Sequence, residues 1–332
     1  MKVLMVHAHH EPQSFCSALN LRAQKELEKN GHEIILSDLH ALNFDPVSDR
    51  RNFTTTKDAA YLKQQQEEIY ATENSGFAQD LDKEMRKLEN CDALIFSFPL
   101  WWFGMPAILK GWCDRVLAMG RIYGGGKFYE SGLGDSKKRA MLITTTGGGP
   151  NVYDGWGLNP PMENLLQPVQ QGIFWFNGFL PLEPFVAWSP ARMSEKDRAQ
   201  SLDSLATRIQ NLFEEEPIQL PLMDDFPNWG PDKKNRFQVV AKRTAPIDQK
   251  YMALVPKEIE RINELKKQGA VMDFQMSAPD DSEWRAFMKI RAVDEGAVKQ
   301  LLASLPLSNY LTFEISRLVH FSHANITTCF KV

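Results

Sequence analysis

Residues 93–112 read ALIFSFPLWWFGMPAILKGW and decide the fold. The segment 93–98 is an apolar run broken only by Ser97, as is typical of a strand buried on both faces of a parallel sheet. Pro106 suits the first turn of a helix, because the N–H it lacks would have no intrahelical acceptor there, and we expect this helix to extend to about Met119. A buried strand followed closely by a helix is the repeating unit of an α/β fold.

The same alternation extends over the first two-thirds of the chain. Apolar runs predict strands at residues 2–6, 33–37, 93–98, 140–145 and 182–187. Helical spacing predicts helices at residues 15–30, around 81–88, and at 106–119, 162–176 and 194–213. Ser194 and Asp197 form a pattern like a capping box, and Asn177-Gly178 is a helix stop. Because parallel neighbours need crossover connections, we expect a doubly wound, five-stranded parallel sheet.

The composition changes after residue 213. Residues 214–235 are rich in proline and acidic side chains, as in a linker. Beyond them, strands are predicted at 237–242, 271–276, 284–290 and 311–319, with helices ending near 267 and at 297–302. This β-α-β-β-α-β order is ferredoxin-like. We therefore expect domains at 1–217 and 236–332, joined by a linker at 218–235.

Length and composition indicate two ordinary globular domains in a chain of 332 residues with a net charge of −4. This charge offers no basic face for nucleic acid or anionic lipid. The apolar run at residues 2–6, which His7 ends, is too short for a signal peptide, and no stretch reaches the roughly 18 apolar residues of a spanning helix. The four cysteines form no CxxC pair, so neither a disulfide framework nor a metal site is indicated, and we expect a cytoplasmic protein without membrane partners.

Three loops follow predicted strands at the edge where a doubly wound sheet binds ligands: HAHHEPQSF (7–15), PLWWFG (99–104) and TTTGGGPNVYDGWGLNPP (144–161). His9, Gln13 and Ser14 precede a helix, whose positive end favours an anion such as phosphate. The alternative is that Ser14 only caps the helix. The sequence has no G-x-G-x-x-G or G-x-x-x-x-G-K-[ST], which disfavours a dinucleotide Rossmann domain and a P-loop.

The other two loops combine glycines with aromatic rings. Gly147 to Gly149 can bring backbone N–H groups close to a flat ligand, although a triple glycine is also common in mobile loops. Tyr153 and Asn159 add hydrogen-bonding side chains. The aromatic residues 101–103 could each belong to the core, but three in a row cannot all face it. At least one ring is therefore expected to face the crevice and to suit a flat cofactor or substrate.

Together these motifs resemble the NAD(P)H:quinone oxidoreductase family, flavin enzymes of flavodoxin-like fold. The resemblance covers residues 3 to about 217 and is strongest in the loops above and in DLHALNFDPV (38–47), FSFPLWWFGMPAILKGWCDRV (96–116), QPVQQGIFWFNGF (167–179) and LEP (182–184). It implies hydride transfer from NADPH or NADH through a flavin to a quinone, with both substrates using one slot in turn. It also implies a homodimer, in which a second subunit completes the slot.

The resemblance assigns roles residue by residue. The flavin-binding residues would be His9, Ser14, Phe15, Ala18, Pro99, Leu100, Trp101, Trp102, Phe103, Thr145, Gly147, Gly148, Tyr153, Arg198 and Leu202. Arg198 matches the arginine on the adenine side, which favours FAD over FMN. The substrate slot would consist of Trp102, Phe103, Tyr123, Phe128, Val152, Asn159 and Phe176, and the catalytic residues would be Tyr153 and Asn159.

One catalytic position departs from the family pattern. Where many members carry a histidine proposed to relay protons, this chain has Asn159, which donates a hydrogen bond but does not titrate near neutral pH. Two other functions remain open on the sequence: an FMN-dependent azo or nitro reductase, and a flavodoxin-like electron carrier or regulatory binding protein.

The last hundred residues look like the small ferredoxin-like domains of the muconolactone isomerase and YCII-related group. This looser resemblance rests on FQVVAKRTAP (237–246) and SLPLSNYLTFEISRLVHF (304–321). It supplies no convincing acid, base and anchor set, and we expect this domain to serve in dimerisation or in covering the pocket.

Overall fold

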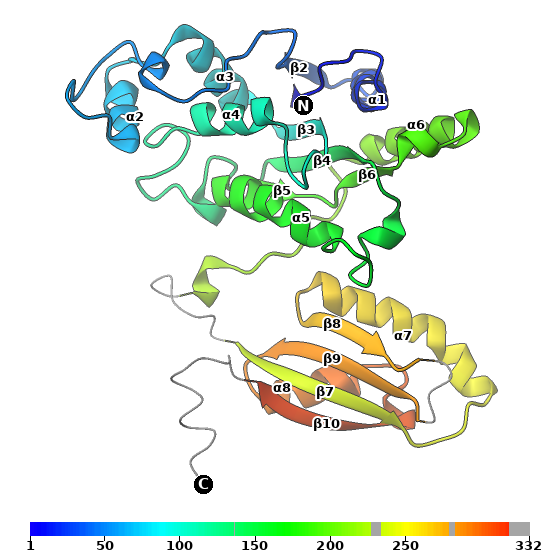
Figure 1. Ribbon diagram of the computed structural model, residues 1–332. Coiled ribbons are helices and arrows are strands. Elements are labelled where there is room, and N and C mark those ends of the chain that lie inside the picture. The colour runs from blue at the N-terminus through cyan, green and yellow to red at the C-terminus, as the bar shows by residue number, and fades with distance from the viewer. Residues whose placement is uncertain (136, 227–233, 279–282, 319–332) are drawn as a thin grey trace. The chain divides into compact units, whose positions relative to one another are not determined.

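The computed structural model describes residues 1–135, 137–226, 234–278 and 283–318 (Figure 1). The chain divides into two compact units, Met1–Ile218 and Gln219–Val332. Each unit has its own sheet and its own hydrophobic core.

The first unit contains the predicted parallel sheet. Its strands are β1 (Lys2–His7), β2 (Glu33–Asp38), β3 (Ala93–Pro99), β4 (Arg139–Thr146), β5 (Leu180–Pro181) and β6 (Phe185–Trp188). The order is β2-β1-β3-β4, and both β5 and β6 pair with β4. The prediction of one continuous fifth strand at 182–187 is therefore wrong. Pro184 lies between the two short strands and has no N–H to donate to a ladder.

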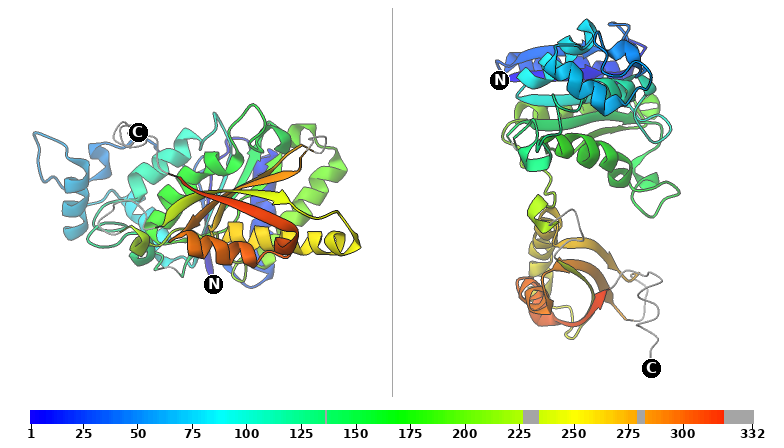
Figure 2. Two further views of the ribbon diagram at one scale, coloured as in Figure 1. Left: turned by 90° about the horizontal axis from the view of Figure 1, so that it is seen from below. Right: turned by 90° about the vertical axis from the view of Figure 1, so that its left-hand side faces the viewer.

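Helices cover both faces of this sheet, as Figure 2 shows. Helices α1 (Phe15–Lys29) and α6 (Glu195–Gln210) pack against one face, through Leu19, Leu27, Leu205 and Ile209 among others. Helices α3 (Gln79–Asn90), α4 (Ala107–Val116) and α5 (Met162–Val169) pack against the other. The doubly wound arrangement expected from the sequence is confirmed.

Local signals placed two helix ends correctly. At the start of α6, Ser194 Oγ accepts the Asp197 N–H at 3.2 Å and the Asp197 carboxylate accepts the Ser194 N–H at 3.3 Å, which is the predicted capping box. Helix α5 continues as a π-helix, Gln170–Phe174, and a 3-10 turn, Trp175–Asn177, before it ends at Gly178 with φ of +82°. Pro168 cannot donate the helical hydrogen bond at its position, and the helix widens just after it.

Helix α2 (Gln64–Glu73) was not predicted, because its sequence QQQEEIYATE has no apolar stripe. Two buried acidic side chains anchor it instead. Glu67 accepts the Lys57 and Asp58 N–H groups at 2.8 Å each, and Glu68 accepts the Met119 N–H at 2.7 Å. Hydrogen bonds to loop amides thus take the place of apolar packing on this helix.

The described residues of the second unit form a four-stranded antiparallel sheet and two α-helices. Its elements are β7 (Asn235–Arg243), α7 (Gln249–Lys267), β8 (Val271–Met276), β9 (Arg285–Ala292), α8 (Glu295–Ala303) and β10 (Leu311–Leu318). The strand order is β10-β7-β9-β8, and both helices contribute to one core, through Ile262, Leu265, Val298 and Leu302. The predicted end of the last strand at Val319 lies outside the described residues.

Other sequence expectations concern membranes, metals and thiols. In the described ranges, no helix combines the length and apolar character needed to cross a bilayer. No group of three or more His, Cys, Asp or Glu side chains suitable for a metal ion occurs in the same ranges. Cys16, Cys91 and Cys113 are buried free thiols, and burial raises the pKa of Cys91 to about 11, so it is an unreactive packing residue. Cys329 lies outside the described residues.

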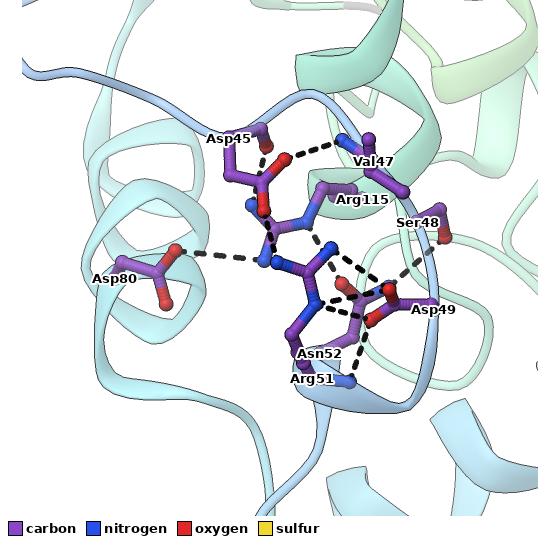
Figure 3. Close-up of polar contacts among 8 residues, drawn as sticks. All are labelled: Asp45, Val47, Ser48, Asp49, Arg51, Asn52, Asp80 and Arg115. Atoms are coloured by element: carbon purple, nitrogen blue, oxygen red, sulfur yellow. Dashed lines mark hydrogen bonds and ion pairs between the residues drawn. The ribbon is translucent and has the colours of Figure 1, made fainter.

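A buried arginine holds together the long connection between β2 and α3 (Figure 3). Arg115 of α4 donates to Asn52 Oδ1 at 2.8 Å and to the Asp45 carbonyl at 2.6 Å, and it lies 3.6 Å from the Asp80 carboxylate. Its guanidinium also lies 5.1 Å from the centre of the Phe44 ring. Because Arg115 is only 4% exposed, these groups replace the water that the charge loses.

We expect Arg115→Met to lower the free energy of unfolding by about 3 kcal/mol, since it leaves buried acceptors without a donor. Urea denaturation measures this change. The matched control is Lys110→Met on the same helix, where an exposed pair with Asp114 is broken and the expected loss is below about 1 kcal/mol. Equal losses in the two variants would contradict a structural role for the buried arginine.

Candidate functional site

The carboxyl ends of β1, β3 and β4 are neighbours in the sheet, and the loops that follow them lie side by side. The Leu100 N–H donates to the Thr145 carbonyl at 2.8 Å, which joins the second loop to the third. The Trp101 ring lies 5.8 Å from the His9 ring, and the Phe103 ring lies 6.5 Å from the Tyr153 ring. The candidate site therefore draws on all three loops identified in the sequence.

The first loop turns tightly into α1. His9 Nδ1 accepts the Glu11 N–H at 3.0 Å, and its ring stacks on His10 at 5.0 Å. Burial and the neighbouring His10 lower the pKa of His9, so the ring is neutral near pH 7. Ser14 caps α1 by accepting the Ser17 N–H at 3.1 Å. Phe15 and Ala18 lie partly exposed in the first turn, where the Ala18 N–H donates to the Ser14 carbonyl at 2.9 Å.

Sequence reasoning missed the buried histidine behind this loop. His7 is 2% exposed, with Nδ1 at 3.1 Å from Ser97 Oγ and Nε2 at 3.1 Å from Ser17 Oγ. Ser17 Oγ donates in turn to the Glu11 carbonyl at 2.9 Å. The network ties the ends of β1 and β3 to the start of α1. The available signal was a histidine that interrupts an apolar strand at the ligand-binding edge.

The second loop is a two-residue turn with an unusual backbone. Trp101 and Gly104 exchange N–H to carbonyl hydrogen bonds, both of 3.0 Å, and the residues between them have left-handed backbones, with φ of +52° at Trp102 and +61° at Phe103. Such turns favour asparagine and glycine, and each aromatic residue costs about 1–3 kcal/mol there. Trp102 is 98% exposed and Phe103 47% exposed. The rings are thus outside the core, as expected, while Leu100 packs against it and Pro99 is buried at the end of β3.

The glycine-rich loop packs closely under Tyr153. A Cβ atom at Gly148 would lie 2.8 Å from a Val152 methyl group and 2.9 Å from the Tyr153 ring, so only glycine fits. At Gly147 a Cβ atom would meet nothing within 4 Å, which leaves space on that side of the backbone. Thr145 and Tyr153 are buried, and the Asn159 N–H donates to the Val152 carbonyl at 3.2 Å.

The predicted substrate residues fall into two ring clusters. One contains Phe103 and Tyr153, beside Val152 and Asn159. In the other, the Phe176 ring lies 5.7 Å from Tyr123 and 5.6 Å from Phe128. The Tyr123 hydroxyl also accepts a hydrogen bond from Gln65 at 3.2 Å.

Arg198 and Leu202 lie on α6, which packs against α1. The Arg198 guanidinium donates to the Met193 carbonyl at 2.6 Å, and Leu202 packs against the same core cluster as Phe15. An ion pair of 3.4 Å between Arg22 and Asp203 joins the two helices. These residues are therefore on the α1 side of the sheet.

Comparisons with known proteins agree with this geometry. Residues 1–212 match the model of a family described as having a flavodoxin-like fold. The chain is 38% identical over 220 residues to the ribosyldihydronicotinamide dehydrogenase [quinone] of Pongo abelii, covering 65% of this chain and 94% of that protein. The chain belongs to the flavodoxin-like NAD(P)H:quinone oxidoreductase family.

Two further relatives of this family are informative. The NAD(P)H dehydrogenase [quinone] 1 of Rattus norvegicus is 38% identical over 218 residues, covering 65% of this chain and 79% of that protein. A Klebsiella pneumoniae structure assigned as a quinone reductase superposes with a TM-score of 0.64 at 36% identity, over 67% of this chain and 88% of the other. The family match ends at residue 212, so it describes the first unit.

The site suits the flavin that quinone reductases of this fold generally use. An exposed aromatic turn offers a flat apolar wall, and the first turn of α1 offers N–H groups to an anion. The open side of Gly147 allows a flat ligand to approach the backbone. The aromatic turn, the start of α1 and the open side of Gly147 therefore fit a flavin.

The buried His7 makes the free energy of unfolding depend on pH. Burial lowers its pKa from 6.5 to about 4, so the unfolded chain binds a proton in this range and the folded chain does not. We expect a contribution of about 3 kcal/mol that is complete above pH 6.5 and is lost as the pH falls to 4. Urea denaturation between pH 4 and pH 7 should show a smaller rise in the free energy of unfolding for His7→Gln than for the wild type. His10→Gln, which removes an exposed imidazole, is the control, and an equal flattening there would contradict the assignment.

Proposed function

We propose that the protein transfers hydride from NADPH or NADH through a bound flavin to a quinone, in a two-electron reduction. The observation that carries this proposal is the exposed aromatic turn at 101–103 beside Tyr153 and the glycine-rich loop. The 38% identity over nearly the whole length of a quinone dehydrogenase supports it.

The residues that would hold the flavin lie around the ends of β1, β3 and β4. The first turn of α1, with His9, Ser14, Phe15 and Ala18, would bind the phosphate and ribityl part. Residues 99–103 would line the ring system, with Thr145, Gly147, Gly148 and Tyr153 at its edge. Arg198 and Leu202 would contact an adenine, so we favour FAD, with FMN as the alternative.

A flavin supplies the group that accepts hydride from the nicotinamide and passes it on to the quinone. The protein has to position both partners and stabilise the charge that develops. The Tyr153 hydroxyl would donate a hydrogen bond at the flavin edge, and the amide of Asn159 would orient the substrate without changing its charge near neutral pH. Phe103 and Trp102 would cover the slot, and because one slot serves both substrates the kinetics would be ping-pong.

A homodimer would complete this slot. Trp102, Trp156 and Leu158 are 98, 78 and 96% exposed, an unusual density of bare apolar side chains next to the site. The rings of Tyr123, Phe128 and Phe176 form a cluster of their own, which suits residues presented to the site of a second subunit.

The remaining assignments concern organisation and location. We assign residues 1–217 to the flavin-binding domain, 218–235 to a linker and 236–332 to a ferredoxin-like domain related to the muconolactone isomerase and YCII-like group. The β10-β7-β9-β8 order and the β-α-β-β-α-β sequence support the ferredoxin-like class. Buried free thiols are consistent with a reducing, cytoplasmic location.

The visible absorption spectrum tests the proposed reaction. Under anaerobic conditions we expect a flavin band that bleaches with NADPH or NADH and returns with menadione, and the flavin released on denaturation to be FAD.

Phe103→Ala should lower quinone turnover about tenfold with little loss of flavin, because this half-exposed ring lies edge-on beside Tyr153. Leu42→Ala, at another exposed site, is the control. A chain that takes up no flavin, or one whose flavin nicotinamide cannot reduce, would overturn the proposal.

The oligomeric state tests whether a second subunit completes the substrate slot. We expect sedimentation equilibrium to give twice the 37.9 kDa chain mass. Leu158→Asp should weaken the dimer at least tenfold, since it places a charge in an apolar contact. Leu42→Asp, at a leucine that is 51% exposed, should leave the mass unchanged. A monomeric wild-type chain with full activity would contradict a shared slot.

A further inference from the structure

The second unit contains a partly open, apolar cavity of about 320 Å³, lined by residues of this unit. It lies between α7 and the sheet. Its walls are aromatic and aliphatic, with Phe274, Trp284 and Met288 on the sheet side and Val255 and Ile262 on the helix side. Figure 1 shows α7 along this face of the sheet.

One carboxyl side chain is buried in this apolar wall. Glu258 of α7 is 8% exposed and lines the cavity. Its Oε2 accepts the Leu307 N–H at 2.9 Å. Burial raises the pKa of Glu258, which favours the protonated form. A protonated carboxyl in this position can donate a hydrogen bond to a ligand.

Within the described residues, no ion pair joins Glu258 to another charged group of the cavity lining. The remaining titratable or charged residues of the cavity are Arg243 of β7, which is exposed, and Tyr251 of α7, whose ring packs edge-on against Tyr310 at 5.4 Å. Strands β8 and β9 and residues 305–311 contribute only apolar side chains to it. Burying a charged ligand among these apolar side chains would cost free energy, so the cavity favours a neutral molecule.

Size narrows the class of ligand. A cavity of about 150 Å³ holds one benzene ring, so this cavity has room for about two fused rings. We propose that the second unit binds a neutral two-ring aromatic carbonyl compound between α7 and the sheet, with its carbonyl oxygen bonded to Glu258. All residues that line this cavity belong to the second unit.

Isothermal titration calorimetry of the full, flavin-loaded chain with 2-acetylnaphthalene tests the proposal. This ketone has two rings and one carbonyl group. We expect one site per chain that Val255→Trp and Ala286→Trp block, because each fills the cavity. Glu258→Leu should weaken binding about tenfold, and Glu258→Gln, whose amide still donates, should bind nearly as well as the wild type.

The pH dependence separates a specific hydrogen bond from general apolar binding. Wild-type affinity should fall as rising pH ionises Glu258, and Glu258→Gln should bind equally across the range. Glu260→Gln, an exposed change on the same helix, is the control and should behave as the wild type. Circular dichroism establishes folding, and if neither tryptophan variant folds, nuclear Overhauser effects between the probe and the Trp284 indole decide the location.

Two results would overturn the proposal. One is the absence of a site that depends on Glu258 and Val255 in folded protein. The other is a binding heat in the folded Val255→Trp and Ala286→Trp variants that equals the heat of the wild type. This result would place the probe in the quinone slot. Neither result bears on flavin reduction by nicotinamide, so failure here is distinct from failure of the proposed reaction.

Discussion

The parallel pairing of β1 with β3 is the constraint on which the first unit depends. In this register His7 is opposite Ser97, and their side chains hydrogen-bond at the edge where both strands end. Through Ser17 the same imidazole fixes the start of α1. A shift of one residue would turn every side chain of β1 to the opposite face and break this network. The polar contact therefore fixes the register at the point where the loops begin.

The strained turn at Trp102 and Phe103 depends on that fixed edge. Left-handed backbone at two bulky residues is unfavourable, and it persists because the ends of the turn are held on both sides. The Leu100 N–H bonds to β4, and the Trp101 and Gly104 backbone groups bond to each other. In return the turn presents rings to solvent that would otherwise enter the core. Stability is given up where a flat apolar surface is needed, which is a pattern typical of binding sites.

A structural feature can be predicted from the sequence when the residues that cause it are neighbours in the chain. Strand and helix periodicity, the Ser194 cap and the Gly178 stop are local signals, and the structure confirms them. Helix α2 is anchored by Glu67 and Glu68 to distant amides, so its sequence gave no apolar period to detect. The split between β5 and β6 at Pro184 also has a local cause, since proline has no N–H to donate to a strand pair. The role of His7 depends on two partners 10 and 90 residues away, which periodicity cannot supply.

The two units form apolar surfaces with different parts of their folds. In the first, loops at strand ends gather aromatic rings and a phenol at an open edge. In the second, Glu258 lies on a helix and lines a partly open apolar cavity between the helix and the sheet. Burying a carboxyl costs free energy that a leucine at this position would not, and the one backbone hydrogen bond it makes offsets only part of that cost. A ligand that accepts a hydrogen bond from the acid, as proposed above, would offset the rest.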